Sequence, residues 1–280
     1  MILVTGATGT VGSGVCRQLH AAGVRPRALV RDGAAARTLL GDRIDPVEGD
    51  LDRPETLDPA LAGIDRLFLL TRQSRRQPEQ ERAIIDAAAR AGTMRIVKLS
   101  VFRADKASQL RIARQHADAE QAVRRSGLAH VFVRPVFFMQ NLIRMARAGA
   151  LYTAAGDGRV AMVDARDVAA VSADLLRGPL RDRRAHTLTG PQAMTFDEAA
   201  EILSDQTGRR FRHVRVSPAD VRTALERSGV EPWFAADMAR LHSMLADGYE
   251  DRTTDDVRAV TGTSPRTLAE FGRDLAHHLR

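Results

Sequence analysis

The chain has 280 residues, of which 44% are hydrophobic, and this length allows one large domain or one domain with a small lobe. The formal net charge of +7 comes with 35 acidic residues and only 4% aromatic residues, a composition that argues against a nucleic-acid-binding face. A single cysteine and the lack of any run of 18 apolar residues argue against a multi-cysteine metal site, an internal disulfide and a membrane span, so we expect a cytoplasmic protein.

The first half of the chain alternates apolar strands with helices at short spacing. The predicted strands are 2–5, 27–31, 45–48, 66–71, 95–100 and 130–134, and the predicted helices between them are 11–22, 33–40, 55–61, 78–91 and 108–125. Strands that alternate with helices form a parallel sheet covered on both faces. With right-handed crossovers, residues 1–150 are predicted to form a Rossmann-type, doubly wound α/β domain.

The second half is richer in helices. Helices are predicted at 167–176, 195–207, 218–228, 232–246 and 266–279, and short strands at 159–163, 185–188 and 211–216. Residues 151–280 are therefore predicted to form a smaller, mainly helical lobe. The lobe is partly interleaved with the Rossmann domain, because 185–188 can return to the main sheet.

A glycine-rich turn joins the first predicted strand to the first predicted helix. Glycines recur every third residue between Thr5 and Gly12. Such glycines allow a tight turn, a close approach of backbone to a pyrophosphate, and close packing of the helix on the strand. The amides at the helix start then point at the phosphates, where the helix dipole favours an anion. We predict a dinucleotide site formed by Gly6, Thr8, Gly9, Thr10, Val11 and Gly12.

Arg31 follows the second predicted strand, where NAD-specific sites carry an acidic residue that holds the ribose 2′-hydroxyl. A guanidinium suits a 2′-phosphate instead, because its charge is permanent and its donors are planar. Arg37 on the next helix is a second candidate for this phosphate, whereas Asp32 is an alternative ligand of the ribose. The cofactor predicted from these residues is NADPH.

Further candidate cofactor residues follow the third, fourth and fifth predicted strands. The carboxyl ends of parallel strands share one edge of the sheet, and ligands bind at that edge. We expect Asp50 and Leu51 beside the adenine. The other candidates at this edge are Leu70, Thr71, Arg72, Ser100 and Val101.

Together these segments resemble the NmrA-like group of atypical short-chain dehydrogenase/reductases. The resemblance extends to residues 134–141, 155–158, 164–169 and 188–191, and it covers nearly the whole chain. It implies a Rossmann fold that binds a nicotinamide dinucleotide. The group includes dye reductases, a quinone reductase and a redox-sensing regulator, so the resemblance implies no single activity.

The catalytic helix of ordinary short-chain reductases carries a tyrosine and, four residues later, a lysine that lowers the tyrosine pKa. This chain lacks that pair, because Gly156 and Thr253 stand four residues after Tyr152 and Tyr249. A different proton donor, or none, is therefore expected.

His116 and Glu120 have the same four-residue spacing on the predicted helix 108–125. A histidine can donate a proton near neutral pH, and a carboxylate one turn away can orient it and raise its pKa. We predict both, with Ser100 at the end of the fifth strand, as catalytic residues. The alternatives are a surface pair that stabilises the helix by about 0.3 kcal/mol, and a plain strand-end hydroxyl.

Residues after the sixth strand and in the small lobe are candidates for the substrate side of the site. The predicted cofactor neighbours are Pro135 and Phe137, and the predicted substrate neighbours are Phe138, Asn141, Trp233 and Met238. In this interpretation the lobe residues cap a flat aromatic substrate. Ordinary core packing is the alternative, and it is the simpler explanation for any single lobe residue and for the two phenylalanines.

Three functions are compatible with these residues. The first is an NADPH-dependent oxidoreductase that transfers a hydride to a flat conjugated small molecule, such as a quinone, imine, enone or dye-like acceptor. Such acceptors delocalise the developing charge, so they need less help from a protein acid. A non-catalytic NADP(H)-sensing regulator, and an isomerase or cyclase that retains the cofactor, are the alternatives. No nucleic-acid or membrane partner is expected, and the oligomeric state stays open, with a homodimer as one arrangement.

Overall fold

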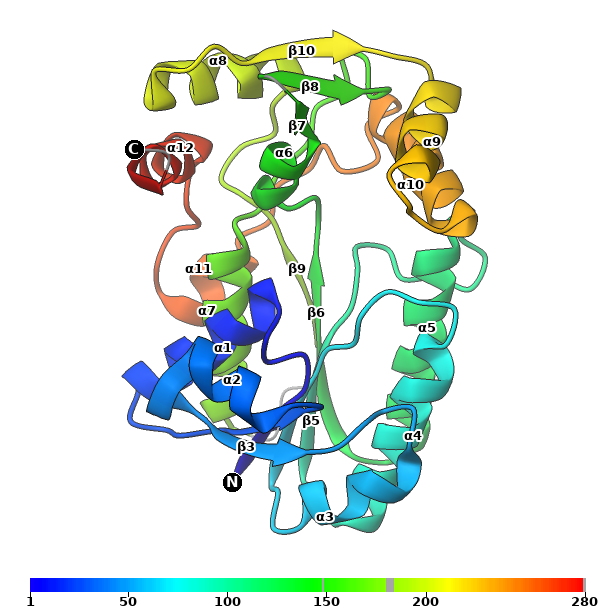
Figure 1. Cartoon of the computed structure of the whole chain (residues 1–280), viewed down its shortest axis with the longest axis vertical. Helices are drawn as coiled ribbons and strands as arrows, with labels where there is room; N and C mark the ends of the chain where they lie inside the picture. Colours follow the sequence, from blue (N-terminus) through cyan, green and yellow to red (C-terminus); the bar gives the residue numbers. More distant parts are fainter. Residues whose placement is uncertain (148, 180–183, 279–280) are drawn as a thin grey trace. The chain divides into compact units, whose positions relative to one another are not determined.

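The computed structural model describes residues 1–147, 149–179 and 184–278. Its main sheet has the strand order β3-β2-β1-β4-β5-β6-β9 (Figure 1). The strands are β1 (Ile2–Val4), β2 (Arg27–Val30), β3 (Asp45–Glu48), β4 (Arg66–Leu69), β5 (Arg95–Leu99), β6 (Ala129–Pro135) and β9 (Ala185–Leu188). Strands β1 to β6 pair in parallel, and the direction of the strand order reverses between β1 and β4. This order confirms the predicted doubly wound Rossmann fold.

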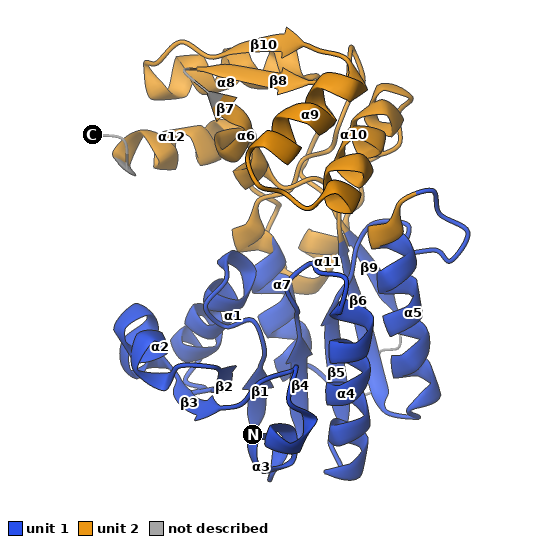
Figure 2. Cartoon of the chain, turned by 45° about the vertical axis from the view of Figure 1, so that its right-hand side comes forward, with its two compact units in different colours: residues 1–109, 113–134, 168–187 blue, residues 110–112, 135–167, 188–280 orange. Residues whose placement is uncertain are grey.

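Helices connect these strands and cover both faces of the sheet. They are α1 (Thr10–Ala21), α2 (Gly33–Leu40), α3 (Leu57–Leu61), α4 (Gln77–Arg90), α5 (Arg111–Arg125) and α7 (Ala165–Arg177), with short 3-10 turns η1 (Gly41–Arg43) and η2 (Pro54–Thr56). Right-handed crossovers place α1 and α2 on one face and α4 and α5 on the other, where α4 and α5 lie side by side in both ribbon views (Figures 1 and 2). Helix α1 lies close to α7, because a Cβ built on Gly14 would stand 2.7 Å from the Cβ of Ala169.

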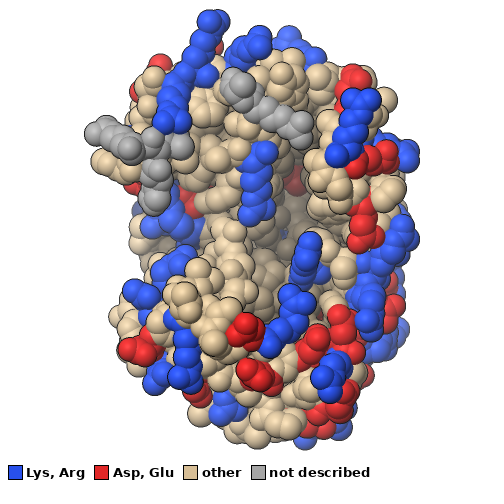
Figure 3. Space-filling view, in the orientation of Figure 1, with Lys and Arg blue, Asp and Glu red and all other residues tan. Residues whose placement is uncertain are grey.

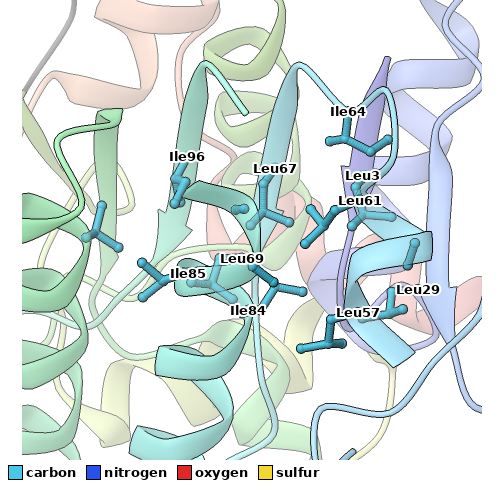
Figure 4. Packing of buried hydrophobic residues seen from close by; sticks show 14 of the residues in the cluster. Leu3, Leu29, Leu57, Leu61, Ile64, Leu67, Leu69, Ile84, Ile85 and Ile96 are labelled. Atoms are coloured by element: carbon cyan, nitrogen blue, oxygen red, sulfur yellow. The ribbon is translucent and has the colours of Figure 1, made fainter. Parts of the chain in front are cut away.

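The core on the α3–α4 face of the sheet is made of large aliphatic side chains (Figure 4). Leu3, Leu67 and Ile96 point into it from three neighbouring strands, and Leu61 and Ile84 cover them from α3 and α4. All five are fully buried, and burial of each such side chain contributes about 1.5–3 kcal/mol to stability. This packing holds the strands in place, and with them the carboxyl ends that carry the candidate site.

A second, smaller sheet has the order β10-β8-β7. Strand β8 (Ala150–Thr153) pairs in parallel with β10 (Arg212–Arg215) and antiparallel with β7 (Ala146–Arg147). The other helices of this part of the chain are α6 (Met139–Met145), α8 (Phe196–Thr207), α9 (Pro218–Arg227), α10 (Pro232–Ala246), α11 (Asp256–Thr261) and α12 (Leu268–His278). A separate core in this part of the chain includes Phe137, Phe196 from α8 and Leu245 from α10.

The chain divides into two compact units (Figure 2). The first unit is Met1–Gln109, Ala113–Arg134 and Val168–Thr187, and the second is Leu110–Ile112, Pro135–Asp167 and Leu188–Arg280. We expected the boundary between the two domains at residue 150, but residues 135–150 belong to the second unit. Residues 168–187 belong to the first, because β9 is the last strand of the Rossmann sheet and α7 lies close to α1.

Several short elements differ from the sequence-based expectation. The expected strand 159–163 is not a regular strand, and its ends form isolated bridges, Val160 with Met194 and Val163 with Phe138. Helices α6 and α11 and strands β7 and β8 were not expected; each is seven residues or fewer, too short for a periodic pattern to stand out. The expected last helix, 266–279, corresponds to α12, and Leu279 lies outside the described residues.

His242 on α10 makes the stability of the second unit sensitive to acid. Burial, helped by the charge of nearby His213, lowers the pKa of His242 to about 4 from 6.5. The unfolded chain therefore binds the proton more tightly, and stability is lost as the pH falls from 6.5 towards 4. The shift corresponds to about 3 kcal/mol. We expect His242→Gln, measured by urea unfolding at pH 7 and pH 4, to lose less stability on acidification than the wild type by roughly this amount.

The control for this measurement is His20→Gln, since His20 is exposed on α1. Its acid-induced loss should equal that of the wild type. An equal loss in His242→Gln and His20→Gln would contradict the proposed linkage.

Candidate functional site

The glycine turn lies between β1 and α1 in the first unit. Gly6 has a φ of +62°, a left-handed conformation that glycine adopts at little cost, and the Gly9 amide donates to its carbonyl oxygen at 3.0 Å. A Cβ on Gly12 would lie 2.1 Å from the same carbonyl oxygen, far inside any van der Waals contact. The turn can therefore close only where these side chains are absent.

The start of α1 is suited to an anion. Gly9 caps the helix without a side-chain hydrogen bond, and the first turn carries no acidic residue. The first amides of a helix lack acceptors within the helix and carry the positive end of its dipole. Thr8 and Thr10 are exposed here, whereas Val11 is buried against the fold. We call the turn from Gly6 to Gly12 the glycine cradle, because a Cβ on either glycine would fill its space. The cradle and the start of α1, which no side chain caps, together fit the pyrophosphate of a dinucleotide.

Thr5 fastens this turn to the residue after β4. Its hydroxyl accepts a hydrogen bond from the Leu70 amide at 2.8 Å and lies 2.8 Å from the Leu70 carbonyl oxygen. A Cβ on Gly6 would stand 2.9 Å from that carbonyl oxygen. The structure thus brings two of the predicted cofactor segments into direct contact.

Arg31 and Asp32, after β2, have different surroundings. The Asp32 carboxylate accepts a hydrogen bond from the Ala35 amide at 2.9 Å and so caps α2. Asp32 is thereby engaged in its own helix, whereas Arg31 and Arg37 are exposed. Arg31 and Asp32 were the two candidates for contact with the adenosine ribose. Asp32 caps its own helix, whereas Arg31 is exposed at the end of β2.

The segment after β3 is held by local hydrogen bonds. The Asp50 amide donates to the Thr56 hydroxyl at 2.9 Å, and the Asp50 carboxylate accepts from the Asp52 amide at 3.0 Å. Leu51 is half-buried and packs against the core under α3 and α4. Among the candidates after β4 and β5, Arg72 is exposed, and Val101 is half-buried.

His116 does not pair with Glu120, contrary to the sequence-based expectation. Its Nδ1 lies 3.3 Å from the Lys98 ammonium, and its Nε2 lies 3.0 Å from the Gln73 side-chain amide. The side chain is buried. That burial and, second, the charge of Lys98 hold the pKa of His116 well below 6.5. The expected rise in its pKa is therefore wrong, because the neighbour is a cation and not a carboxylate.

Glu120 instead forms the centre of a buried ion-pair cluster with β5 and β6. Its two oxygens accept from Arg134 Nε at 2.8 Å and from an Arg134 terminal nitrogen at 2.5 Å. Ser100 donates to Glu120 at 2.7 Å, and Arg124 lies 3.0 Å away on the next helical turn. Ser100 and Glu120, both predicted as catalytic residues, thus contact each other, and among the described residues neither is hydrogen-bonded to His116.

Lys98 and Glu81, which the sequence analysis did not single out, form a second cluster under α4 and α5. Both side chains are fully buried, and the ammonium lies 2.9 Å from Glu81 Oε1. The same oxygen accepts from Thr71 at 2.8 Å and from Gln77 at 3.2 Å. The hydroxyl of Thr71, a predicted cofactor residue, is therefore hydrogen-bonded to Glu81.

A compositional signal for Lys98 was present in the sequence. Arginine fills 40 of the 42 basic positions, and the rare lysine at 98 interrupts an apolar strand. A charged residue in a central strand must be paired when it is buried.

The model of the NmrA-like family matches residues 1–271 of this chain. The chain belongs to the NmrA-like family. Two curated relatives share its full length. An NAD(P)H azoreductase of Xenophilus azovorans is 39% identical over 98% of this chain and 97% of its own length. A (4-alkanoyl-5-oxo-2,5-dihydrofuran-3-yl)methyl phosphate reductase of Streptomyces griseus is also 39% identical, over 99% of this chain and 98% of its own length.

A solved structure shows the same fold. The NADPH-dependent quinone oxidoreductase of Escherichia coli, complexed with NADPH, superimposes with a TM-score of 0.88 at 28% identity. The match covers 98% of this chain and 99% of that one. The family and the fold expected from the sequence are both confirmed.

The remaining predicted residues of this NmrA-like chain lie in the second unit. The Phe137 ring is buried in the core of that unit, with its centroid 5.7 Å from that of Phe196 in an edge-on contact, as the core-packing alternative expects. Pro135 is buried at the end of β6, and Phe138 and Asn141 are half-buried at the start of α6.

Trp233 and Met238 lie on α10, and both are half-buried. The Trp233 ring contacts Phe234 edge-on and lies 5.2 Å from the Arg111 guanidinium. Its indole nitrogen donates to Glu231 at 2.8 Å. Neither residue belongs to the core cluster around Phe196. Because both are partly exposed, the core-packing alternative does not account fully for their positions, and their contact with a substrate stays a prediction.

Within residues 1–147, 149–179 and 184–278, no group of three histidine, cysteine or carboxylate side chains is arranged to hold a metal ion. In the same residues, none of the helices is long and apolar enough to cross a membrane. On the face drawn in Figure 3, basic side chains are spread over the surface with acidic ones between them.

Proposed function

We propose that this protein is an NADPH-dependent reductase that delivers a hydride to a flat, conjugated small molecule such as a quinone, an imine, an enone or a dye-like acceptor. The observation that carries the proposal is the glycine cradle at Gly6 and Gly12, with Arg31 exposed at the end of β2. Relatives that act as an azoreductase and a quinone oxidoreductase support the choice of acceptor. We assign it to the atypical short-chain reductases without a tyrosine–lysine pair.

The residues of the first unit have distinct proposed roles. NADPH, when bound, supplies the hydride. Gly9, Thr10 and Val11 hold its pyrophosphate, and Asp50 and Leu51 lie at the adenine. Ser100 and Glu120 position the ends of β5 and β6 through the Arg134 ion pair. His116 offers an N–H hydrogen bond and not an imidazolium proton, because its pKa is lowered by burial and Lys98.

That arrangement favours acceptors whose charge is delocalised. A neutral hydrogen-bond donor can stabilise developing charge on an oxygen or nitrogen, but it releases a proton less readily than an imidazolium does. A quinone or an azo compound spreads that charge over a conjugated system, and the product can take its proton from water. An isolated ketone would need stronger protonation, so we expect it to react slowly.

The test is a turnover assay with purified protein and NADPH. Quinones, azo dyes, enones and cyclic imines are supplied in turn, and oxidation is followed at the absorbance of the reduced nicotinamide. We expect turnover with at least one conjugated acceptor and much less with a simple ketone. Tight NADPH binding without turnover of any acceptor would sink the reductase proposal.

The choice of NADPH is tested by Arg31→Ala. Loss of a charge-assisted contact to the 2′-phosphate should weaken NADPH binding at least tenfold, corresponding to about 1.5 kcal/mol or more. NADH binding should change less than about twofold, since NADH lacks that phosphate. Dissociation constants from nicotinamide fluorescence measure both. Arg17→Ala, another exposed arginine of the first unit, serves as the control and should change neither. Equal losses for NADPH and NADH would show that Arg31 does not read the phosphate.

A second candidate function is an NADP(H)-sensing protein that passes its state to a partner without hydride transfer. The buried position of His116 and its lowered pKa favour it, because a ring that stays neutral has no imidazolium proton to transfer near neutral pH. The turnover assay separates the two functions. An isomerase or cyclase that retains the cofactor would consume substrate without net oxidation of NADPH. The proposal includes no nucleic-acid partner, and it leaves the oligomeric state open, with a homodimer as one arrangement.

A further inference from the structure

Lys98, His116 and Gln73 form one hydrogen-bonded row inside the first unit. Lys98 comes from β5, His116 from α5, and Gln73 from the loop between β4 and α4. The ammonium lies 3.3 Å from His116 Nδ1, and the opposite ring nitrogen, Nε2, lies 3.0 Å from the Gln73 amide nitrogen. Lys98 and His116 are buried, so water does not compete freely for these contacts.

The ammonium decides which ring nitrogen carries the proton. Lys98 has three N–H donors and no acceptor. Its three neighbours are Glu81 Oε1 at 2.9 Å, the Leu99 carbonyl oxygen at 3.1 Å and His116 Nδ1 at 3.3 Å. Each can accept one of the three protons, and the charge is balanced by Glu81. Nδ1 must then be the acceptor of the neutral ring, so the ring proton resides on Nε2.

The unpartnered oxygen of the Gln73 amide, and not the orientation in which that amide is placed, supports the same assignment. As placed, its NH₂ group faces a ring nitrogen that carries a proton, so two donors face each other. Its oxygen, Oε1, is buried and has no hydrogen-bond partner among the described residues. The two ends of a glutamine amide are nearly indistinguishable in shape, and a half-turn exchanges them. After that half-turn the oxygen accepts from Nε2–H, and the donor–donor conflict disappears.

We propose that Lys98 is a positioning residue that fixes His116 as a neutral ring with its proton on Nε2, held by the Gln73 oxygen until an acceptor molecule replaces it. The role of this N–H in the reaction rests on the proposed reductase function, whereas the state of the ring does not. Lys98 itself touches no substrate. It acts through the histidine, which would present a fixed hydrogen-bond donor throughout the neutral pH range.

The charges around His116 are consistent with a ring that stays neutral. Lys98 faces it from β5, and Glu81, on α4, is already bound to Lys98. Glu120, one turn further along α5, is bound to Arg134 from β6 and to Arg124. The nearest charged group is thus a cation, and the two buried carboxylates of α4 and α5, Glu81 and Glu120, are bound to other cations.

A lysine suits this position better than the arginine that fills most basic sites of the chain. An ammonium is a compact charge whose three donors can meet three separate acceptors, whereas a guanidinium is a planar fork. The three acceptors come from α4, β5 and α5 in a fully buried space. This geometry gives a physical reason why position 98 is a lysine in a chain with 40 arginines.

The test is nitrogen NMR of the histidine rings in the full-length protein without cofactor. Ring nitrogens with and without a proton resonate far apart, so the spectrum reports the tautomer. The His116 signals among the eight histidines are assigned by their loss in His116→Gln. We expect protonated Nε2, unprotonated Nδ1 and no titration between pH 5 and 8 in the wild type. In Lys98→Met we expect a mixture of tautomers or a ring that titrates in this range.

Two further variants keep the result interpretable. Lys98→Met leaves Glu81 without its ion-pair partner, so the pair Lys98→Met with Glu81→Gln removes both charges and protects the fold. Lys106→Met removes the other lysine of the chain, which is exposed and contacts Asp118, and should leave the His116 signals unchanged. A wild-type ring protonated on Nδ1, or the wild-type tautomer and titration retained in both Lys98 variants, would overturn the proposal.

Activity supplies an independent readout. If an acceptor is found, both Lys98 variants should lower kcat at least tenfold and leave the KM for NADPH within about twofold, as expected for the loss of one oriented donor. An unchanged kcat would overturn the role of the N–H in the reaction. If no acceptor is reduced while the NMR result holds, the reductase function fails and the fixed tautomer stands.

Discussion

Replacing Gly12 with alanine is expected to abolish measurable NADPH binding. The new Cβ would stand 2.1 Å from the Gly6 carbonyl oxygen and 3.0 Å from the Ala7 Cα, so α1 must move away from the turn. That movement would displace the amides proposed to bind the pyrophosphate. We expect the Kd for NADPH to rise at least a hundredfold and the free energy of unfolding to fall by about 1–3 kcal/mol from overpacking.

Gly33→Ala is the matched control for Gly12→Ala. Gly33 begins α2 in the same unit, and a Cβ there would have its closest contact at 3.5 Å, an ordinary van der Waals distance. This variant should bind NADPH like the wild type. Titration calorimetry measures both affinities, and urea unfolding measures both stabilities. Wild-type affinity in Gly12→Ala would show that the close approach of α1 to the turn is not needed for the cofactor.

Removal of Glu120 is expected to have the largest effect on stability. Glu120 is buried at the junction of α5, β5 and β6, and it accepts from Arg134, Arg124 and Ser100. In Glu120→Ala the Arg134 guanidinium keeps its partly desolvated position but loses both bonds. Breaking a buried pair by removing one partner costs about 3–5 kcal/mol, and partial exposure of Arg134 places the expectation near 3 kcal/mol.

The control for Glu120→Ala is Asp118→Ala on the same helix. Asp118 is exposed and lies 3.2 Å from the exposed Lys106, so its loss should change stability by less than about 0.5 kcal/mol. Both values come from urea unfolding at neutral pH. If Glu120→Ala were no more destabilised than Asp118→Ala, the cluster would not support the ends of β5 and β6. Glu120→Gln should fall between the two, since an amide retains one acceptor.

Much of the fold could be predicted because local patterns and global topology agree. Strands β1 to β6 and the helices α1, α2 and α4 follow clear apolar periods and start within two residues of the expected positions. The second unit was harder. Its short elements, such as α6 and β8, depend on packing against neighbours distant in sequence, and their own residues carry too few periods to predict them.

The site was predicted unevenly for the same reason. The tight turn at Gly6 and Gly12 could be predicted because its glycines form a contiguous motif with a fixed place after a strand, whereas its role in cofactor binding stays a prediction. The relation of His116 to Glu120 was misjudged, since helical spacing shows that two residues share a face but not which partners reach them first. Arg134 from β6 binds the carboxylate, and Lys98 from β5 binds the imidazole.

The sequence by itself determined the Rossmann topology, the dinucleotide turn beginning at Thr5, and the absence of the tyrosine–lysine pair, because each depends on the order of residues along the chain. Only the tertiary structure decided the charge state at the centre of the site. Lys98, Glu81 and His116 are far apart in sequence, and the packing of α4 and α5 on β5 brings them within hydrogen-bonding distance in a buried space. There burial and a neighbouring ammonium outweigh the tendency of an exposed histidine to take up a proton, and the residue expected to donate a proton is held neutral.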